Sequence, residues 1–282
     1  MLGAIIGDAA GADYEVLEVQ KLKQGKIRTY EERMKIMDPN IPLLNEKFET
    51  TDDSCLTVAI ADAILNNKSY ADTLKEYGML EMQLGLDKYG RSRFGKGFIK
   101  WLEGNSEGTS YGNGCAMRIG PVGYLFDSIE KIKYQSYLAT IPSHNHPESK
   151  LCAEAVAISI YALRKGVTKK LLRDYLNKNY FNVEFDLEDL RHNYSFTSRA
   201  INSVPQAIFC FLVSNSFEDA IRISLSIGGD ADTIACITGS LAESYYGLDE
   251  QLVKNVKPYL KDYMKPVINQ FYKEVNKQKV LK

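Results

Sequence analysis

Residues 52–66, with the sequence DDSCLTVAIADAILN, decide the fold class. Two acidic residues open this segment, and good helix formers follow, with apolar residues at spacings of three and four. Negative charge in a first turn interacts favourably with the helix dipole, so the segment predicts a helix. Residues 148–165 and 232–246 repeat the pattern, and few stretches alternate with a period of two. We therefore expect an all-α protein.

Outside these segments, the sequence predicts further amphipathic helices over residues 69–85, 167–178, 203–214, 216–226 and 250–275. A first helical segment carries Gly3, Gly7 and Gly11 at intervals of four residues, and a late one carries Ala235 and Gly239. Residues four apart lie on one face of a helix. These two helices are therefore expected to pack with a short distance between their backbones.

Length and composition set the broad class. A chain of 282 residues, 45% of them hydrophobic, can bury a sizeable core, and it contains no repeat or linker that would divide it. We expect one domain over residues 1–282. The 35 basic and 36 acidic residues nearly cancel, so no overall field attracts nucleic acid or an anionic membrane. No exposed apolar repeat calls for a partner, and we expect a monomer.

The cysteines and the first residues bear on the compartment. Five cysteines, an odd number without a C-x-x-C pair, favour reduced thiols in a cytoplasmic protein. Residues 1–8 lack a basic region, and Asp8 interrupts their apolar run, which is not typical of a signal peptide. Because no other segment is long enough to span a bilayer, we expect no membrane association.

Two acidic clusters are the first candidates for chemistry. They are Thr51-Asp52-Asp53-Ser54 and, directly after Gly228-Gly229, Asp230-Ala231-Asp232-Thr233. Taken alone, each is explained by helix capping, in which a Thr or Asp side chain accepts a backbone N–H and contributes about 1 kcal/mol. Carboxylates among apolar residues are nevertheless costly unless a positive charge compensates them. Together, four carboxylates and two hydroxyls form a ligand set for two hard cations, with water completing six-fold coordination.

Other metal and phosphate motifs are weaker. The histidines and cysteines do not have the spacing of a zinc site. Residues 90–97 come within one residue of a P-loop but lack its final Ser or Thr, so we discount them. The loop at residues 111–118 has glycines at 112 and 114 and can direct successive N–H groups at a phosphate, although an ordinary Asn-Gly turn is the better explanation when the loop is taken alone. Ser143-His144 lies just before a predicted helix, where His144 is either a structural residue or a ligand contact.

Five motifs follow one another over residues 1–247: Gly3-x3-Gly7-Asp8-x2-Gly11-x3-Glu15, Thr51-Asp52-Asp53-Ser54, Gly112-Asn113-Gly114-x-Ala116-Met117-Arg118, Ser143-His144 and Gly228-Gly229-Asp230-Ala231-Asp232-Thr233. In this order they resemble the ADP-ribosylglycohydrolase family, which includes hydrolases that reverse mono-ADP-ribosylation of arginine or serine and glycohydrolases that activate dinitrogenase reductase. The resemblance implies a single-domain orthogonal helical bundle with a cleft for two Mg²⁺ or Mn²⁺ ions. Residues 248–282 would add C-terminal helices.

The resemblance also implies roles for individual residues. Six would bind the metal ions: Thr51, Asp52, Asp53, Asp230, Asp232 and Thr233. Five would receive the diphosphate: Gly112, Asn113, Gly114, Cys115 and Ala116. His144 would help to bind ADP-ribose, and Glu15 would line or gate the pocket of the distal ribose. Ser54 departs from the Thr that is common in the family, with no expected effect on metal binding.

The reaction that the resemblance implies is hydrolysis of the N- or O-glycosidic bond between ADP-ribose and a protein side chain or a small-molecule conjugate. The ions would hold the ribose hydroxyls and activate water. Asp53, Asp232 or Glu15 would act as base or stabilise positive charge on the sugar, and the sequence does not choose among them. Arginine, serine, O-acetyl and nucleic-acid adducts all present the same ADP-ribose, so the acceptor is open. Nucleic acid is expected only as such a modified substrate.

Two other functions remain open at this stage. One is a non-catalytic ADP-ribose-binding protein, similar to the crystallin members of the family. The other is a two-metal phosphohydrolase, since paired metal ions also serve phosphate ester cleavage. Release of free ADP-ribose distinguishes glycosidic cleavage from both.

Overall fold

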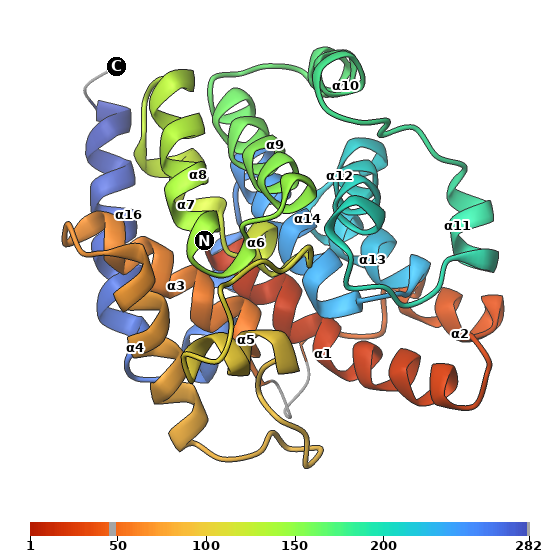
Figure 1. Ribbon diagram of the computed structural model, residues 1–282. Helices are drawn as coiled ribbons and strands as arrows, with labels where there is room; N and C mark the ends of the chain where they lie inside the picture. Colours follow the sequence, from red (N-terminus) through yellow and green to blue (C-terminus); the bar gives the residue numbers. More distant parts are fainter. Residues whose placement is uncertain (45–48, 281–282) are drawn as a thin grey trace.

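The computed structural model describes residues 1–44 and 49–280, and Figure 1 shows this part of the chain as a bundle of helices. Residues 281 and 282 of the expected C-terminal helices lie outside it. The α-helices are α1 (Leu2–Lys23), α2 (Tyr30–Met34), α3 (Asp52–Leu65), α4 (Tyr70–Gln83), α5 (Lys96–Leu102), α6 (Gly114–Met117), α7 (Gly120–Leu125), α8 (Ile129–His144), α9 (Pro147–Arg164), α10 (Lys169–Asn179), α11 (Leu187–Asn193), α12 (Val204–Val213), α13 (Phe217–Ile227), α14 (Ala231–Tyr246), α15 (Glu250–Val256) and α16 (Met264–Val280). Three short 3₁₀ helices join them: η1 (Lys35–Met37), η2 (Ala200–Asn202) and η3 (Lys257–Tyr259).

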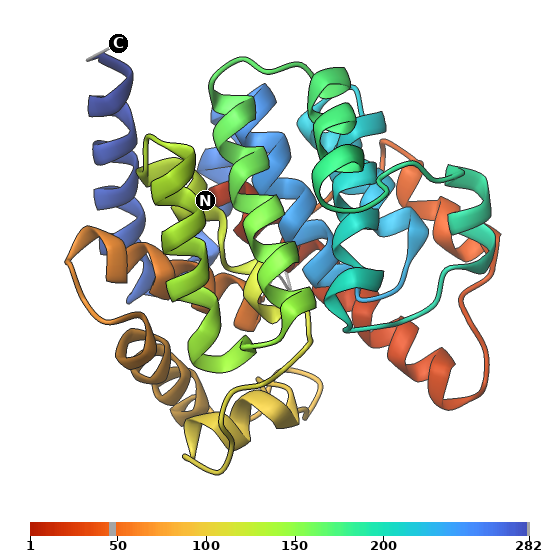
Figure 2. The ribbon, with the colours of Figure 1, turned by 45° about the horizontal axis from the view of Figure 1, so that its top comes forward.

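Helix α14 lies at the centre of the molecule and packs against α1, α9, α12 and α13 (Figures 1 and 2). Its closest neighbour is α1, as the glycine spacing predicts. A Cβ atom added at Gly3 would lie 2.4 Å from the carbonyl oxygen of Gly239, and one added at Gly7 would lie 2.0 Å from that of Ala235. At Gly11 it would lie 2.4 Å from Cα of Asp232. Only glycine permits this approach of two backbones.

The remaining helices surround this pair. Helix α3 packs against α1, α4, α7 and α16, and α9 packs against α6, α7, α8 and α14. One hydrophobic core cluster includes buried side chains from Met1 to Val275, which supports the proposal that residues 1–282 form a single domain. All five cysteines are buried free thiols. Within the described residues, no helix combines the length and apolar character that crossing a bilayer requires.

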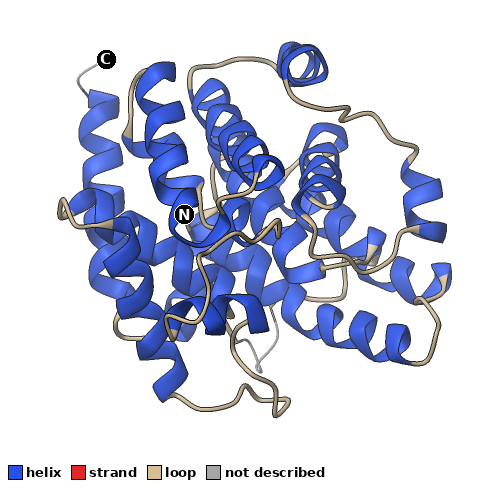
Figure 3. Cartoon of the chain, viewed as in Figure 1, coloured by secondary structure: helices blue, strands red, loops and turns tan. Residues whose placement is uncertain are grey.

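The all-α class is confirmed, since Figure 3 shows only helices and loops and the described residues add just two isolated β-bridges. One predicted helix is wrong in its extent. Residues 250–275 divide into α15, η3 and α16, and Pro258, which has no N–H to donate, lies in the first turn of η3. The sequence also fails to predict α8, because several residues on its buried face are small or polar, such as Ser136, Ala139 and Thr140.

Candidate metal centre and substrate cleft

The first acidic cluster lies where α3 begins. Thr51 is the N-cap residue, and its hydroxyl accepts a hydrogen bond from the N–H of Asp53 at 3.3 Å. Asp52 and Asp53 follow in the first turn, where the helix dipole favours negative charge. Helix capping is therefore confirmed for Thr51. It does not explain the two carboxylates, which lie inside the helix.

Asp8 of α1 fixes this cluster in place. Its Oδ1 accepts a hydrogen bond from the Thr51 hydroxyl at 2.7 Å, and its Oδ2 accepts from the backbone N–H groups of Thr51 at 2.9 Å and Ser54 at 3.1 Å. The Ser54 hydroxyl also donates to Oδ2. Asp8 is fully buried. Its role was not predicted from the sequence, although a carboxylate that interrupts an apolar helix needs compensation wherever it is buried.

The second acidic cluster follows two glycines with positive φ. Gly228 has a φ of 76°, and a Cβ atom there would lie 2.3 Å from Oε1 of Glu18 and 2.7 Å from Nη2 of Arg33. Helix α14 begins at residue 231, so its N-cap is Asp230, whose side chain makes no capping hydrogen bond. Asp232 and Thr233 lie inside the first turn of α14. The interpretation that one of them caps this helix is therefore wrong. Asp232 Oδ1 instead accepts a hydrogen bond from the N–H of the next residue at 2.8 Å.

The two clusters meet where α3 and α14 begin. The hydroxyl of Thr233 donates to Oδ2 of Asp53 at 3.4 Å, although 180 residues separate them. Two groups of carboxylates result, and within each group one oxygen per residue lies within 4.8 Å of the others. One group contains Asp8, Asp53 and Asp232, and the other contains Glu15, Asp230 and Asp232. Asp232 belongs to both groups, so the second cluster connects them.

The charges of this region repel one another. Burial, followed by the charges of neighbouring carboxylates, raises the pKa of Asp52, Asp53 and Asp232 well above the usual range. Burial and then Glu15 raise the pKa of Asp230 to about 7. Within the described residues, Asp53 Oδ1 is buried without a hydrogen-bond partner. Hard divalent cations prefer carboxylate and hydroxyl oxygens, so this donor set fits such ions.

A cavity of about 390 Å³ opens beside the carboxylates. Asp53, Asp230, Asp232 and Thr233 line one side, and the loop around Gly112 lines another. The side-chain amide of Asn113 joins the two sides. It donates to Oδ2 of Asp230 at 2.8 Å and to the hydroxyl of Ser203 at 3.2 Å. The glycine loop is thus attached directly to the second acidic cluster.

Few backbone N–H groups of this loop remain for a phosphate. The N–H of Gly112 donates to the Ser110 hydroxyl at 3.1 Å, and that of Asn113 donates to a backbone carbonyl at 2.8 Å. The N–H of Ala116 bonds back to the carbonyl of Asn113 at 2.8 Å. Gly114 and Cys115 form the N-terminal end of α6, where N–H groups have no partner inside the helix. Of these two residues only Gly114 lines the cavity, so the structure narrows the expected phosphate-binding nest to Gly114.

His144 packs against the same loop, next to Arg118. A Cβ atom at Gly114 would lie 3.1 Å from Nε2 of His144. Burial, and then the charge of Arg118, lower the pKa of His144 well below its usual value, so the imidazole is neutral. Arg118 Nη2 donates to the Ser143 hydroxyl at 2.8 Å, and that hydroxyl lies 2.8 Å from His144 Nδ1. This series of donors assigns the imidazole proton to Nε2.

Arg118 is the cation nearest to the glycine loop in the sequence, and it also lines the cavity. Its side chain is fully buried, and burial lowers its pKa to about 10. In the described part of the chain, its Nε and Nη1 have no hydrogen-bond partner. An unpaired buried guanidinium is costly unless an anion compensates it. The lining of the cavity therefore includes carboxylates and, next to the glycine loop, a positive charge.

The model of the ADP-ribosylglycohydrolase family matches residues 1–279. The chain belongs to this family. ADP-ribosylhydrolase ARH3 of Mus musculus is 22% identical over 89% of this chain and 83% of its own length. ADP-ribosyl-[dinitrogen reductase] glycohydrolase of Rhodospirillum rubrum is 24% identical over 88% and 85%, and ADP-ribosylarginine hydrolase Tri1 of Pseudomonas putida is 22% identical over 88% and 70%.

A solved structure of an ADP-ribosylglycohydrolase-related protein complex shares the fold. Its TM-score is 0.69, and the likeness covers 97% of this chain and 95% of that one at 21% sequence identity. The helical architecture of this chain is therefore shared with that structure. At this identity the likeness extends to the fold alone.

The structure brings most of the predicted site residues of this ADP-ribosylglycohydrolase together. The residues that line the cavity are Glu15, Asp52, Asp53, Gly112, Asn113, Gly114, His144, Asp230, Asp232 and Thr233. Cys115 and Ala116 are fully buried and do not line it. Thr51 lines an adjoining cavity. Two residues that the sequence analysis gave no role, Asp8 and Arg118, belong to the same region.

Proposed function

We propose that this ADP-ribosylglycohydrolase is a metal-dependent hydrolase that cleaves the glycosidic bond between ADP-ribose and a modified acceptor, with release of ADP-ribose. The observation that carries the proposal is the single cavity that is lined both by carboxylates and by the glycine loop, His144 and Arg118. A diphosphate is an anion, and a ribose presents a pair of hydroxyls. Arg118 suits the diphosphate, and the carboxylates, with bound cations, suit the hydroxyls of the ribose.

The relatives support the same activity. Those of Mus musculus and Pseudomonas putida are named ADP-ribosyl hydrolases, and the one of Rhodospirillum rubrum is named a glycohydrolase. The carboxylate groups support a site for two Mg²⁺ or Mn²⁺ ions. We propose that Thr51, Asp52, Asp53, Asp230, Asp232 and Thr233 hold these ions. When bound, the ions would supply Lewis-acid activation of water and would orient the ribose hydroxyls.

The residues of the chain account for the rest of the reaction. Arg118 and the N–H group of Gly114 at the start of α6 hold the diphosphate, and the neutral His144 donates from Nε2. This contact places the distal ribose at the carboxylates. The oxygen of water then forms a bond to the anomeric carbon as the bond to the acceptor breaks. Asp53, Asp232 or Glu15 takes the proton of the water, and the acceptor leaves with the electron pair of the broken bond and gains a proton.

The experiment replaces one carboxylate of each cluster, as Asp53→Asn and Asp232→Asn. Release of ADP-ribose from a modified protein should fall about 10³-fold or more in either variant, because charge stabilisation of this kind carries much of catalysis. The exposed Asp262, changed to Asn, provides the control with the same chemical change, and circular dichroism checks that each variant is folded. Near-normal hydrolysis by either cluster variant would overturn the two-metal proposal.

The wild-type chain tests the reaction class directly. We expect free ADP-ribose as the product in Mg²⁺ or Mn²⁺, with no release after chelation. AMP as product would indicate a phosphohydrolase. Binding of ADP-ribose without any release in either metal would indicate the non-catalytic ADP-ribose-binding alternative.

A further inference from the structure

A second cavity, of about 200 Å³, adjoins the first across the acidic clusters. Both cavities are lined by Glu15, Asp52 and Asp232. The glycine loop and His144 line only the larger cavity, which the proposed function fills with ADP-ribose. The anomeric carbon would then lie at the shared carboxylates. The group attached to that carbon would extend into the second cavity.

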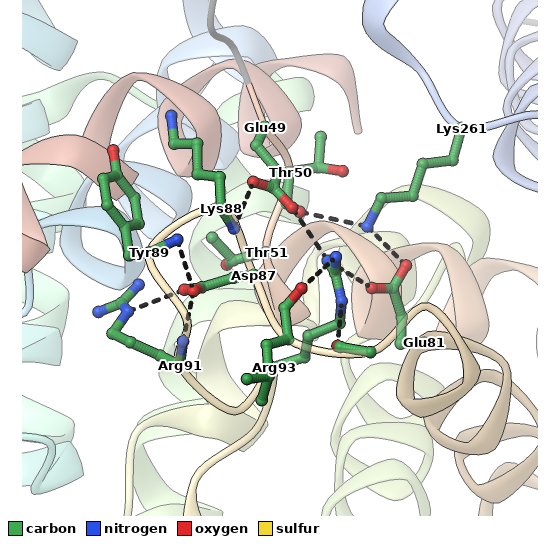
Figure 4. Close-up of polar contacts among 12 residues, drawn as sticks. Glu49, Thr50, Thr51, Glu81, Asp87, Lys88, Tyr89, Arg91, Arg93 and Lys261 are labelled. Atoms are coloured by element: carbon green, nitrogen blue, oxygen red, sulfur yellow. Dashed lines mark hydrogen bonds and ion pairs between the residues drawn. The ribbon is translucent and has the colours of Figure 1, made fainter.

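The second cavity is lined by a turn at residues 87–91 (Figure 4). Asp87 Oδ1 accepts hydrogen bonds from the backbone N–H of Arg91 at 2.7 Å and of Tyr89 at 2.9 Å. The backbone closes the turn, since the N–H of Asp87 donates to the carbonyl of Arg91 and that of Gly90 donates to the carbonyl of Asp87, both at 2.9 Å. This turn holds the side chain of Arg91 in a defined position.

The guanidinium of Arg91 bridges two carboxylates. Its Nε donates to Oδ2 of Asp87 at 2.8 Å, and its Nη1 donates to Oε2 of Glu15 at 2.8 Å. Its carbon Cζ lies 5.5 Å from the centre of the Tyr89 ring. Burial lowers the pKa of Arg91, but Glu15 and Asp87 outweigh it and raise the pKa overall. Arg91 therefore stays charged.

The other two described cations that line this cavity, Lys88 and Arg93, are also paired. Arg93 Nη1 lies between Glu49 at 3.1 Å and the buried Glu81 at 3.4 Å, as Figure 4 shows. Lys88 Nζ donates to Asp13 at 2.6 Å. Among the described residues that line it, the cavity consequently offers no unpaired cation to an anionic acceptor. Its carboxylate nearest to the acidic clusters, Glu15, is already bound to a guanidinium of the chain itself.

We infer that Arg91 determines the acceptor: the chain hydrolyses ADP-ribose attached to a neutral hydroxyl group in preference to ADP-ribose attached to a guanidinium. This inference rests on the proposed function. A modified arginine would bring a second guanidinium to Glu15, which already binds that of Arg91, and the two like charges would repel each other. A hydroxyl-linked side chain brings no charge and requires no displacement of Arg91.

The test compares two peptides that carry ADP-ribose on serine and on arginine. We expect the wild-type kcat/KM to be about tenfold or more higher for the serine-linked peptide. In Arg91→Gln, the kcat/KM values for the serine-linked and the arginine-linked peptide should differ by no more than about threefold, chiefly because the arginine-linked peptide is hydrolysed faster. Arg91→Lys keeps a cation and should keep most of the wild-type preference. Because both peptides use the same ADP-ribose site, any general loss of activity in a variant cancels in the ratio.

A wild-type preference for the arginine-linked peptide would overturn the inference, as would an unchanged ratio in Arg91→Gln. Both results leave the proposed function intact, because ADP-ribose is released. Release from neither peptide would instead overturn the proposed function, and the inference with it.

A second measurement does not depend on catalysis. Millimolar methylguanidine should raise the thermal unfolding midpoint of Arg91→Ala, by occupying the vacated position between the carboxylates, and should not raise that of the wild type. An equal response from both proteins would contradict the assignment.

Discussion

The two acidic clusters are attached to the same helix, α1, in different ways. The first cluster is held by hydrogen bonds. The Asp8 carboxylate accepts them from the backbone N–H groups and from the side-chain hydroxyls of both Thr51 and Ser54. The second cluster is held by close packing, since Gly11 leaves only enough room for the backbone at Asp232. One attachment depends on a charge, and the other depends on the absence of a side chain. The clusters should therefore respond to different substitutions.

Gly11→Ala is expected to have the largest effect, because it adds volume at the second attachment. The new Cβ would lie 2.4 Å from a backbone atom of Asp232 and 2.6 Å from the carbonyl oxygen of Ala231, so the two helices must move apart. We expect a loss of about 3 kcal/mol in the free energy of unfolding, measured by urea denaturation, together with a large loss of activity.

Gly97→Ala is the control for this change. No atom lies within 4 Å of a Cβ added at Gly97, which is inside helix α5, so the variant should be as stable as the wild type or more stable by up to about 1 kcal/mol. Equal stability of the two variants would show that close packing does not hold the second cluster.

Asp8→Asn changes charge at the first attachment with almost no change in volume. One amide oxygen replaces two carboxylate oxygens, so at least one of the hydrogen bonds from the first cluster is lost. We expect Mn²⁺ affinity, measured by titration calorimetry, to fall about 10- to 100-fold, as for other residues that orient metal ligands. Stability should decrease by about 1–3 kcal/mol.

Ser54→Ala is the partner to this change, since it removes one donor to Asp8 and leaves the carboxylate in place. Its loss of Mn²⁺ affinity should be smaller than that of Asp8→Asn. An unaltered affinity in Asp8→Asn would mean that the hydrogen bonds of Asp8 do not position the first cluster.

Substitution of His144 has the smallest expected effect. It tests whether this imidazole, rather than the carboxylates of the two clusters, makes the stability of the fold sensitive to acid. The pKa of His144 is lowered in the folded protein, so below about pH 6.5 the unfolded chain binds a proton that the folded protein does not. Stability is therefore lost as the pH falls below this value, by up to about 1.4 kcal/mol per pH unit. His144→Gln should remove about 1.4 kcal/mol from the difference in unfolding free energy between about pH 7.5 and about pH 5.5.

Ser143→Ala removes the hydrogen bond between the Ser143 hydroxyl and His144 Nδ1 but keeps the imidazole. This variant should therefore retain the wild-type dependence of stability on pH. The same slope in wild type and His144→Gln would show that His144 does not contribute to acid sensitivity.

The sequence predicts those parts of the fold and site that depend on local patterns. Helix α3 and the glycine face of α1 follow directly from spacing, and the carboxylates of both clusters stand out because charge among apolar residues needs compensation. The same argument applied to Asp8 would have included it in the site. The position of Asp8 opposite Thr51 is a contact between two helices, and no local pattern in the sequence shows it.

Other features depend on tertiary contacts that no local pattern shows. Arg118 looks like an ordinary residue after a turn, and only its burial without a full set of partners marks it. Arg91 belongs to a segment that was discounted because it failed as a P-loop, and its relation to Glu15 spans 76 residues. Cys115 and Ala116 are predicted to bind the diphosphate only because they belong to the glycine loop. Once that loop forms the short helix α6, they point into the core rather than into the cavity.

The contact between α1 and α14 also determines when the site can assemble. The N–H of Gly3 donates to Oε2 of Glu243, 240 residues further along the chain. On the ribosome, α1 is made first and must remain without its neighbour until α14 has been synthesised. Contacts of such long range slow folding, and chains fold as their parts emerge. The carboxylates of the two clusters therefore stay apart until α14 has been synthesised.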